Sequence, residues 1–425
     1  MNTVTRRTFL RTSAVLAAAS AAYPLRAAAN DRIRVGVIGC RNRGPQVAES
    51  MLRSGQFDVT TLCDCDEAMI DQALKDNGKL FPAPPKTVRD FRRVLDDKEV
   101  DAVVVATPDH WHALMTVMAL DAGKHVYVEK PASYNIADGK AMVAAQAKHP
   151  ELVVQVGTQQ RSGSHFKEAR QFLRDGGLGK VGFVRACIIH DRGVLPIVPD
   201  SDPPATLDYD LWTGPAPMRP YNDSRVHYNW HFMLDYGTGE MGNWGAHWLD
   251  IARWFVDVDF PKSVSGLGGQ FVVKDAKEWP DTQTALLEYP DLTMLWEQRL
   301  WSKFGIGGGP GCHAEFNGDK GSMVISRGGW TFYPKGEKDK NEDHPKSELE
   351  VAHAKNFADC IRGQAQPAAS MQEGHVTAVL CHLCNISAML NRRVVFDGET
   401  QSITGDAEAA KWMSREYRAP WRLEV

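Results

Sequence analysis

The sequence predicts an α/β protein with two domains, a doubly wound parallel sheet followed by an α+β domain whose sheet is mostly antiparallel and open on one face. Between residues 30 and 156, short β-branched apolar runs alternate with helical patterns, which is typical of parallel strands buried on both faces. From residue 157 to 425, strand-like runs alternate apolar and polar residues and lack regular intervening helices. A chain of 425 residues is long enough for two hydrophobic cores.

Residues 1–29 are expected to form an export signal and not part of the fold. Arg6 and Arg7 stand in a T-R-R-x-F-L stretch, followed by an Ala-rich apolar segment and an A-x-A site at 27–29. This arrangement resembles a twin-arginine signal, which predicts a folded protein passed to the twin-arginine machinery and a periplasmic or otherwise exported location. The apolar segment is too short for stable membrane insertion. A buried helix after a chance arginine pair is the alternative.

Net charge and cysteine placement narrow the functional classes. A formal net charge of −4 provides no basic surface, so nucleic acid is not expected as a partner. Eight cysteines would suit disulfides in an exported protein. However, Cys63 and Cys65 alternate in a predicted strand, and Cys381 and Cys384 fall in a helical pattern. We therefore expect buried thiols, with a redox pair at Cys381 and Cys384 as the alternative.

The stretch VGVIGCRNRG, residues 35–44, predicts a dinucleotide-binding turn of the Rossmann type. A buried strand leads into it and a helical pattern follows, and Gly39 and Gly44 occupy the first and third glycine positions of G-x-G-x-x-G. Asp64 ends the next strand, where a carboxylate can bind the ribose hydroxyls. The helix N-terminus supplies amides and a positive dipole to the pyrophosphate. Together these features predict a bound nicotinamide dinucleotide.

Arg41 stands at the second glycine position, and Asn42 and Arg43 complete the turn. All three are expected near the pyrophosphate. Three interpretations of Arg41 remain open: its side chain turns outward, its guanidinium contacts phosphate directly, or the turn is degenerate and binds the cofactor poorly. Asp64 would repel a 2′-phosphate, so NAD is favoured over NADP.

Two further strands are expected to end at the same crevice, because the carboxyl ends of parallel strands face the ligand. One ends in Thr107-Pro108 and the other in Glu129-Lys130. A lysine there can hydrogen-bond the reacting oxygen and stabilise charge during hydride transfer, whereas a solvated lysine is the alternative. His112 opens the helix that follows Thr107-Pro108, and a structural role for it is the alternative to cofactor contact. The predicted cofactor contacts at these strand ends are Thr107, Pro108, His112, Glu129 and Lys130.

Several motifs together resemble one enzyme family. The stretches are ATPDHWH at 106–112, AGKHVYVEKP at 122–131, GTQQRSG at 157–163, DLWTGPAP at 210–217 and HAKNFADCIRG at 353–363. They are similar to the glucose–fructose oxidoreductase and inositol dehydrogenase (Gfo/Idh/MocA) family, over essentially everything after the signal. The resemblance implies an NAD(P)-dependent oxidoreductase of a carbohydrate or polyol, with Lys130 at the reacting carbon. It also implies a homo-oligomer formed through the C-terminal sheet. The last helical patterns are expected to pack back on the nucleotide half.

A segment at 227–255, rich in aromatic residues, is the expected catalytic region of the second half. Asn243, His247 and Asp250 are spaced by four and three residues, which predicts one helical face. His247 matches the family histidine that acts as general acid/base, for which an imidazole is suited. The family usually carries aspartate four residues earlier, where this chain has Asn243. Asp235 or Glu240 would then supply the missing charge, and a packing role for His247 is the alternative.

The same region is expected to bind the sugar, because aromatic ring faces pack against the C–H faces of sugars. Core packing is the alternative for each aromatic residue, and a loop-structural role is the alternative for Gln159 and Arg161. A metal site from Asp235, Glu240 and His247 is not predicted, because no pair has zinc spacing. The predicted substrate-binding residues are Gln159, Arg161, Tyr228, Trp230, Asp235, Tyr236, Trp244 and His247.

Three functions follow. The leading one is an exported oxidoreductase that keeps and regenerates a tightly held nicotinamide cofactor, since little free cofactor exists outside the cytoplasm. The second is an NAD-dependent glycosidase or lyase that oxidises a sugar transiently and eliminates the glycosidic group; no pair of glycosidase carboxylates is evident. The third is a non-catalytic sugar-binding protein, which the departures at Arg41 and Asn243 favour.

Overall fold

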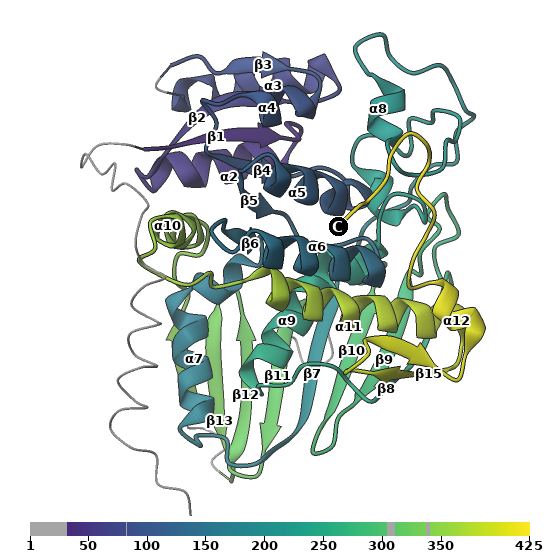
Figure 1. Cartoon of the computed structure of the whole chain (residues 1–425). Coiled ribbons are helices and arrows are strands. Elements are labelled where there is room, and N and C mark those ends of the chain that lie inside the picture. Colours follow the sequence, from purple (N-terminus) through teal and green to yellow (C-terminus); the bar gives the residue numbers. More distant parts are fainter. Residues whose placement is uncertain (1–31, 82, 304–310, 337–340) are drawn as a thin grey trace, which may run out of the picture. The chain divides into compact units, whose positions relative to one another are not determined.

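The first sheet contains six parallel strands in the order β3-β2-β1-β4-β5-β6 (Figure 1). The structure, a computed structural model, describes residues 32–81, 83–303, 311–336 and 341–425, so the expected export signal lies outside the described residues. This strand order is that of a Rossmann dinucleotide-binding sheet and confirms the predicted fold class for the first half. The strands are β1 (Ile33–Ile38), β2 (Phe57–Cys63), β3 (Lys86–Val88), β4 (Ala102–Val105), β5 (His125–Val128) and β6 (Val154–Val156).

Helices cover both faces of this sheet, as buried parallel strands require. All four residues of β4, AVVV, are fully buried. Side-chain caps begin α3, α4 and α6, where Asp66, Asp90 and Asn135 accept hydrogen bonds from backbone N–H groups of the first turns. The helical elements are α2 (Arg43–Arg53), α3 (Glu67–Asn77), η1 (Gly78–Leu80), α4 (Phe91–Asp96), η2 (Asp109–Trp111), α5 (His112–Asp121) and α6 (Ile136–Lys148).

The second sheet has ten strands in the order β14-β13-β12-β11-β7-β10-β9-β8-β15-β16. Among the described residues its strands pair antiparallel except for β10 with β7, which confirms the predicted mostly antiparallel sheet. The strands are β7 (Val181–Ile189), β8 (Ser263–Gly269), β9 (Thr282–Glu288), β10 (Thr293–Arg299), β11 (Cys312–Gly318), β12 (Gly321–Ser326), β13 (Gly329–Pro334), β14 (Glu342–Pro345), β15 (Arg393–Asp397) and β16 (Ser402–Thr404).

One face of the large sheet packs on helices and the other is open. In β9 the side chains of Gln283, Ala285 and Leu287 are buried and those between them are exposed. The helix α11 lies between α6 and the large sheet (Figure 1). The remaining helical elements are η3 (Gln159–Ser162), α7 (Ser164–Arg174), α8 (Tyr209–Thr213), η4 (Asn229–Phe232), the π-turn η5 (Met241–Gly245), α9 (Ala246–Phe255), α10 (Glu350–Ile361), α11 (Met371–Leu390) and α12 (Ala407–Lys411).

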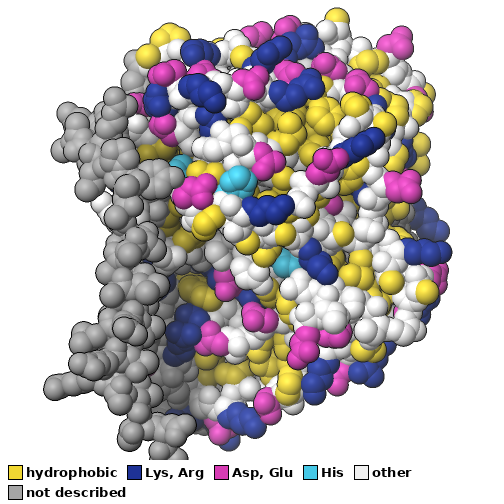
Figure 2. All heavy atoms as spheres, viewed as in Figure 1, with side chains coloured by type: hydrophobic (Ala, Val, Ile, Leu, Met, Phe, Trp, Pro, Cys, Tyr) yellow, Lys and Arg dark blue, Asp and Glu magenta, His cyan; other side chains and the backbone are white. Residues whose placement is uncertain are grey.

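Contacts join the two halves into one unit, Ile33–Val425. The boundary expected after residue 156 falls directly behind β6, and the division into two domains there stays a prediction. The helix α10 packs on the nucleotide half, where Phe357 stacks on Phe57 at 6.0 Å between ring centroids. No helix in the described ranges combines the length and apolarity needed to cross a membrane. Positive and negative side chains are intermixed over the visible face (Figure 2), in keeping with the absence of a basic footprint in the sequence.

Candidate active site: a cleft at the carboxyl ends of the parallel strands

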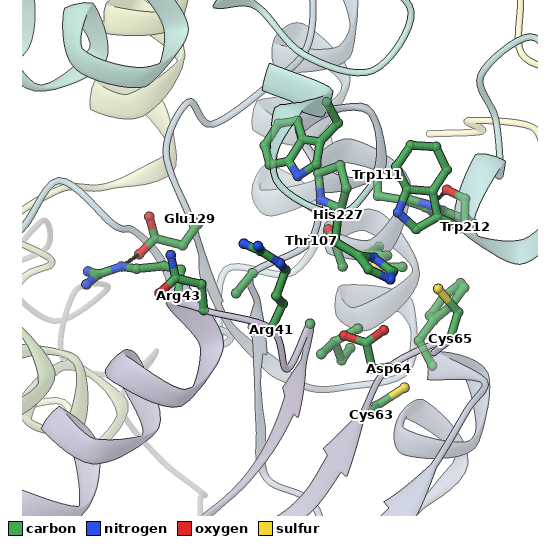
Figure 3. Close-up of a pocket in the computed structure, with 18 of the residues that line it drawn as sticks. Arg41, Arg43, Cys63, Asp64, Cys65, Thr107, Trp111, Glu129, Trp212 and His227 are labelled. Atoms are coloured by element: carbon green, nitrogen blue, oxygen red, sulfur yellow. Dashed lines mark hydrogen bonds and ion pairs between the residues drawn. The ribbon is translucent and has the colours of Figure 1, made fainter. Parts of the chain in front are cut away.

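A cleft opens where β1, β2, β4 and β5 end (Figure 3). It is the crevice expected for the ligand of a doubly wound sheet. Gly44 and His112 do not line the cleft but shape it from behind. The predicted cofactor residues that do line it are Gly39, Arg41, Asn42, Arg43, Asp64, Thr107, Pro108, Glu129 and Lys130.

The two glycines of the turn are required by its geometry. Gly39 has φ +98°, and a Cβ there would lie 2.5 Å from the carbonyl oxygen of Ala106. At Gly44 a Cβ would lie 1.9 Å from the carbonyl oxygen of Gly39. Both side chains are therefore excluded, and the backbone folds tightly at the start of α2. This is the cradle that brings main-chain amides and the helix N-terminus to a pyrophosphate.

Asp64 stands where a dinucleotide would present its ribose. Its carboxylate accepts backbone N–H groups from Cys40 at 2.7 Å and from Asp66 at 3.0 Å, which holds it at the rim of the cleft. Burial raises the pKa of Asp64. Each carboxylate oxygen has a further lone pair for a ribose hydroxyl. The buried hydroxyl of Thr107, in the facing loop, has no hydrogen-bond partner among the described residues. The cradle, the carboxylate and this unused hydroxyl fit NAD.

The two arginines of the turn have different surroundings. Arg41 is exposed, and its guanidinium lies over the ring of Tyr228, 5.3 Å from the centroid. It lines the cleft, and all three interpretations of Arg41 remain open. Arg43 instead bonds Glu129 at 2.7 Å, which a dashed line marks in Figure 3, and Glu350 at 2.9 Å. Arg43 therefore joins α2, the end of β5 and α10.

Lys130 and Asn243 form the central contact of the cleft. The Lys130 ammonium donates a hydrogen bond to Asn243 Oδ1 at 2.8 Å, and both residues line the cleft. Burial lowers the pKa of Lys130. Asn243 belongs to the π-turn η5, a type of helical irregularity that is frequent at functional sites. The amide thus orients the lysine without adding a negative charge.

His247 lies beside Trp244, and no described residue forms a hydrogen bond with its Nδ1. His247 is 5% exposed and is not part of the cleft lining. Burial, and then the charge of Arg327, hold the pKa of His247 well below its usual range. The oxygen of Asn243, which stands at the position of the family aspartate, accepts from Lys130 and not from His247.

Neither of the expected replacement carboxylates contacts His247. Glu240 is buried and binds Arg192 at 2.5 Å. Asp235 lies 3.3 Å from Arg219 and lines a second cavity, away from the cleft. Within the described ranges no group of three His, Cys, Asp or Glu side chains is placed to hold a metal ion.

The predicted substrate residues divide into two groups. Tyr228 and Trp230 line the cleft, and Trp244 is half-buried next to His247, with ring centroids 5.7 Å apart. Tyr236 is fully buried in a separate apolar cluster with Trp212, which favours the core-packing alternative.

Gln159 and Arg161 are turned away from the cleft. Gln159 donates to Glu350 at 2.8 Å. Arg161 is 3% exposed and bonds Asp250 at 2.7 and 2.8 Å and Glu373 at 2.8 Å. These contacts favour the loop-structural alternative for both residues, and Asp250 is the buried ion-pair partner of Arg161. Arg161 therefore holds η3 to α9 and α11.

His112 and the C-x-x-C cysteines have structural surroundings. The His112 ring nitrogens lie 2.7 Å from the carbonyl oxygen of Pro131 and 3.0 Å from that of Thr107, so the ring ties two cleft loops together. Cys381 and Cys384 are free and buried in α11, and burial raises the pKa of both thiols. A redox cysteine needs the opposite shift.

A segment of about residues 204–231 covers the cleft, and of this segment the sequence predicted only Tyr228 and Trp230 as site residues. Its backbone pairs with the loop after β2, where Leu207 bridges Asp66, and His227 Nε2 lies 2.7 Å from Asp66 Oδ2. His227 and His231 both line the cleft (Figure 3 labels His227). His227 and Asp66 lie 161 positions apart in the chain, so no local sequence pattern predicts their contact.

Two family models match the chain, one over the Rossmann half and one over the second half. The model described as the oxidoreductase family, NAD-binding Rossmann fold, matches residues 33–158, and that described as the oxidoreductase family, C-terminal alpha/beta domain, matches 195–282 and 334–423. The chain belongs to the Gfo/Idh/MocA oxidoreductase family. The recognised resemblance is thereby confirmed, and residues 33–158 are the family's NAD-binding domain.

Individual relatives match parts of the chain. A glycosyl hydrolase family 109 protein of Saccharopolyspora erythraea is 31% identical over 215 residues, 45% of this chain and 47% of the relative. The levoglucosan dehydrogenase of Pseudarthrobacter phenanthrenivorans is 27% identical over 168 residues, 39% of this chain and 36% of the relative. The chain thus spans about half or less of the length of these curated relatives.

A solved structure shares the fold over most of the chain. Levoglucosan dehydrogenase in complex with NADH and levoglucosan superposes with a TM-score of 0.67 at 17% identity, covering 86% of this chain and 99% of that chain.

Proposed function

We propose that the protein is an NAD-dependent oxidoreductase that moves a hydride between a carbohydrate or polyol and a tightly held nicotinamide cofactor. The observation that carries the proposal is the position of Lys130, at the end of β5 and in the same cleft as the dinucleotide turn. Family membership and the sugar dehydrogenase among the relatives support it. NAD is favoured over NADP because the Asp64 carboxylate lies at the ribose end of the cleft.

The residues of the cleft have distinct roles in this proposal. A nicotinamide dinucleotide held by the turn at Gly39 and Gly44 would supply the site that takes up and returns the hydride. The Lys130 ammonium donates to the reacting oxygen and stabilises the charge that develops there. Asn243 holds the ammonium in place through the 2.8 Å hydrogen bond. His247, neutral because burial lowers its pKa, is the group proposed to take the hydroxyl proton.

The first test is the cofactor itself. Mass spectrometry of small molecules released from the purified, correctly matured protein should show NAD or NADH. A panel of sugars and polyols should then change the absorbance of the bound cofactor. Protein that is empty, and that takes up neither NAD nor NADP, would instead support a non-catalytic sugar-binding protein.

Exchange of Asn243 for aspartate is expected to move the alkaline limit of activity. Lys130 must be protonated to donate, so activity is present below its pKa and is lost as pH rises through it. Burial lowers that pKa, whereas a carboxylate in place of Asn243 Oδ1 should raise it by about 1–3 units. The alkaline limb of kcat/KM against pH should therefore shift upward in Asn243→Asp. Asn243→Ser, without the charge, is the control; equal profiles in the two variants would contradict the assignment.

A redox-neutral glycosidase is the second candidate, because the relative with 31% identity is a glycosyl hydrolase family 109 protein. In this route a sugar carbon is oxidised, the neighbouring C–H becomes acidic, the glycosidic group is eliminated, and water and the hydride are then added back. Deuterium exchange at the neighbouring carbon together with release of the aglycone, and without accumulation of NADH, would favour it. Stoichiometric formation of a keto sugar would favour dehydrogenation.

Export and assembly belong to the same proposal. The twin-arginine motif supports export of the folded protein, with its cofactor bound, to the periplasm. Fractionation of cells that carry Arg6→Lys/Arg7→Lys tests it, because this variant should stay in the cytoplasm.

A homo-oligomer through the open sheet face is supported by the exposed apolar side chains of that face, among them Leu267 (66% exposed), Leu286 (46%) and Val395 (44%). Light scattering should show a multiple of the chain mass that Leu267→Lys reduces.

A further inference from the structure

Arg327 forms no ion pair within the described part of the chain, and it lies next to Trp244, behind the residues that line the cleft. It lies in the turn between β12 and β13, and its guanidinium lies over the ring of Trp244, 4.9 Å from the centroid. Trp244 directly follows Asn243, the residue that holds Lys130. Within the described part of the chain, the polar contacts of the Arg327 guanidinium are two long hydrogen bonds to Gln160 Oε1, at 3.3 and 3.4 Å.

The other buried arginines around the site are neutralised. Arg43 pairs with Glu129 and Glu350, Arg161 with Asp250 and Glu373, and Arg192 with Glu240. Holding an unpaired cation in a largely buried position costs stability, and burial lowers the pKa of Arg327 accordingly. A ligand with a negative charge would pair with this guanidinium and remove that cost.

Polar atoms next to Arg327 are also without partners among the described residues. Gln160 is 1% exposed, and its amide nitrogen, opposite the oxygen that accepts from Arg327, donates to nothing. The Nδ1 of His247, beside Trp244, is equally without a partner. Guanidinium and amide N–H groups can only donate, and an imidazole nitrogen can donate. The guanidinium of Arg327 and the amide nitrogen of Gln160 therefore need an acceptor, and a negatively charged acceptor would suit the guanidinium best.

We propose that the substrate is an acidic sugar whose carboxylate binds Arg327 while one of its hydroxyl groups reaches Lys130. The planar fork of a guanidinium matches a carboxylate, and the Trp244 ring beside it offers an apolar face for the sugar C–H groups. The proposal rests on the proposed carbohydrate oxidoreductase and narrows its substrate class to uronic acids and their glycosides. It assigns Arg327 as the residue that selects this class.

Titration calorimetry on the cofactor-loaded protein tests it with matched ligands, the methyl glycosides of glucose, galactose and mannose, their uronic acid counterparts and their 6-phosphates. At least one uronate should bind about 10-fold or more tightly than its neutral counterpart. Arg327→Gln should weaken that uronate about 10- to 100-fold, the loss typical of a charge-assisted pair, and change neutral sugars less than about 2-fold. Arg327→Lys should keep part of the preference. In turnover assays the loss should fall on KM and leave kcat nearly unchanged.

Arg92→Gln is the matched control, because Arg92 also lies over a tryptophan ring, that of Trp421 at 5.5 Å, but belongs to α4 and not to the cleft lining. It should leave uronate binding unchanged. Equal binding of uronates and neutral sugars, or a preference that survives Arg327→Gln in folded protein, would overturn the proposal. So would sugar phosphates that bind more tightly than every uronate. Reduction of the cofactor by neutral sugars but not by uronates would support the oxidoreductase and contradict the acidic substrate. Protein that binds no cofactor would instead contradict the oxidoreductase itself.

Discussion

Replacing Lys130 with methionine is expected to lower kcat roughly 1000-fold while the cofactor stays bound. Methionine keeps much of the length and volume of the side chain but removes the ammonium, which is the group proposed to stabilise the charge on the reacting oxygen. Loss of one such donor costs about 100- to 1000-fold in other enzymes, and loss of positioning through Asn243 adds to it. The measurement is single-turnover reduction of the bound cofactor, with its occupancy determined by mass spectrometry on the same sample.

Lys124→Met provides the matched control for this change. Lys124 is also a buried lysine of the nucleotide half, but its ammonium donates to the backbone carbonyls of Asp97 and Val100 at 2.8 and 2.7 Å. Its replacement should lower the melting temperature and leave the rate of the folded protein unchanged. A Lys130→Met protein that is fully loaded and turns over at the normal rate would remove Lys130 from the chemistry.

The parts of the site that follow from local sequence patterns were predictable. The strand, turn and helix around Gly39 and Gly44 are encoded within a dozen residues, and the carboxyl ends of parallel strands must meet at one edge of the sheet. This is why Asp64, Thr107 and Lys130 were expected together, and the structure places all three in the cleft.

Contacts that depend on distant segments or on an irregular turn were not predictable. Arg161 was expected at the substrate, but its partners Asp250 and Glu373 lie 89 and 212 positions away. Asn243 lies in the π-turn η5, and its oxygen accepts a hydrogen bond from Lys130, which lies 113 positions away in the chain. Arg327 belongs to a β-turn whose sequence gives no reason to associate it with His247. In each case tertiary packing, and not the local pattern, decides where the side chain lies.

Replacing Gly44 with alanine is expected to leave a protein without cofactor and less stable by about 3 kcal/mol, at the upper end of the usual cost of overpacking. The added Cβ would lie 1.9 Å from the carbonyl oxygen of Gly39 and 3.0 Å from Val37 Cγ1. The first atom belongs to the backbone of the turn and the second to a fully buried strand residue, so neither neighbour can move without shifting α2 away from β1. That shift withdraws the helix N-terminus, which the pyrophosphate needs.

Urea unfolding and mass spectrometry of the released cofactor measure the two effects separately. Gly78→Ala is the control: Gly78 has φ −55°, and a Cβ there meets nothing within 4 Å, so alanine should be neutral or slightly stabilising and should keep the cofactor. A Gly44→Ala protein that unfolds at the normal urea concentration with the cofactor fully bound would show that the turn tolerates a side chain. Because the close approach of α2 to β1 is what forms the pyrophosphate cradle, that result would also contradict the cofactor site as assigned.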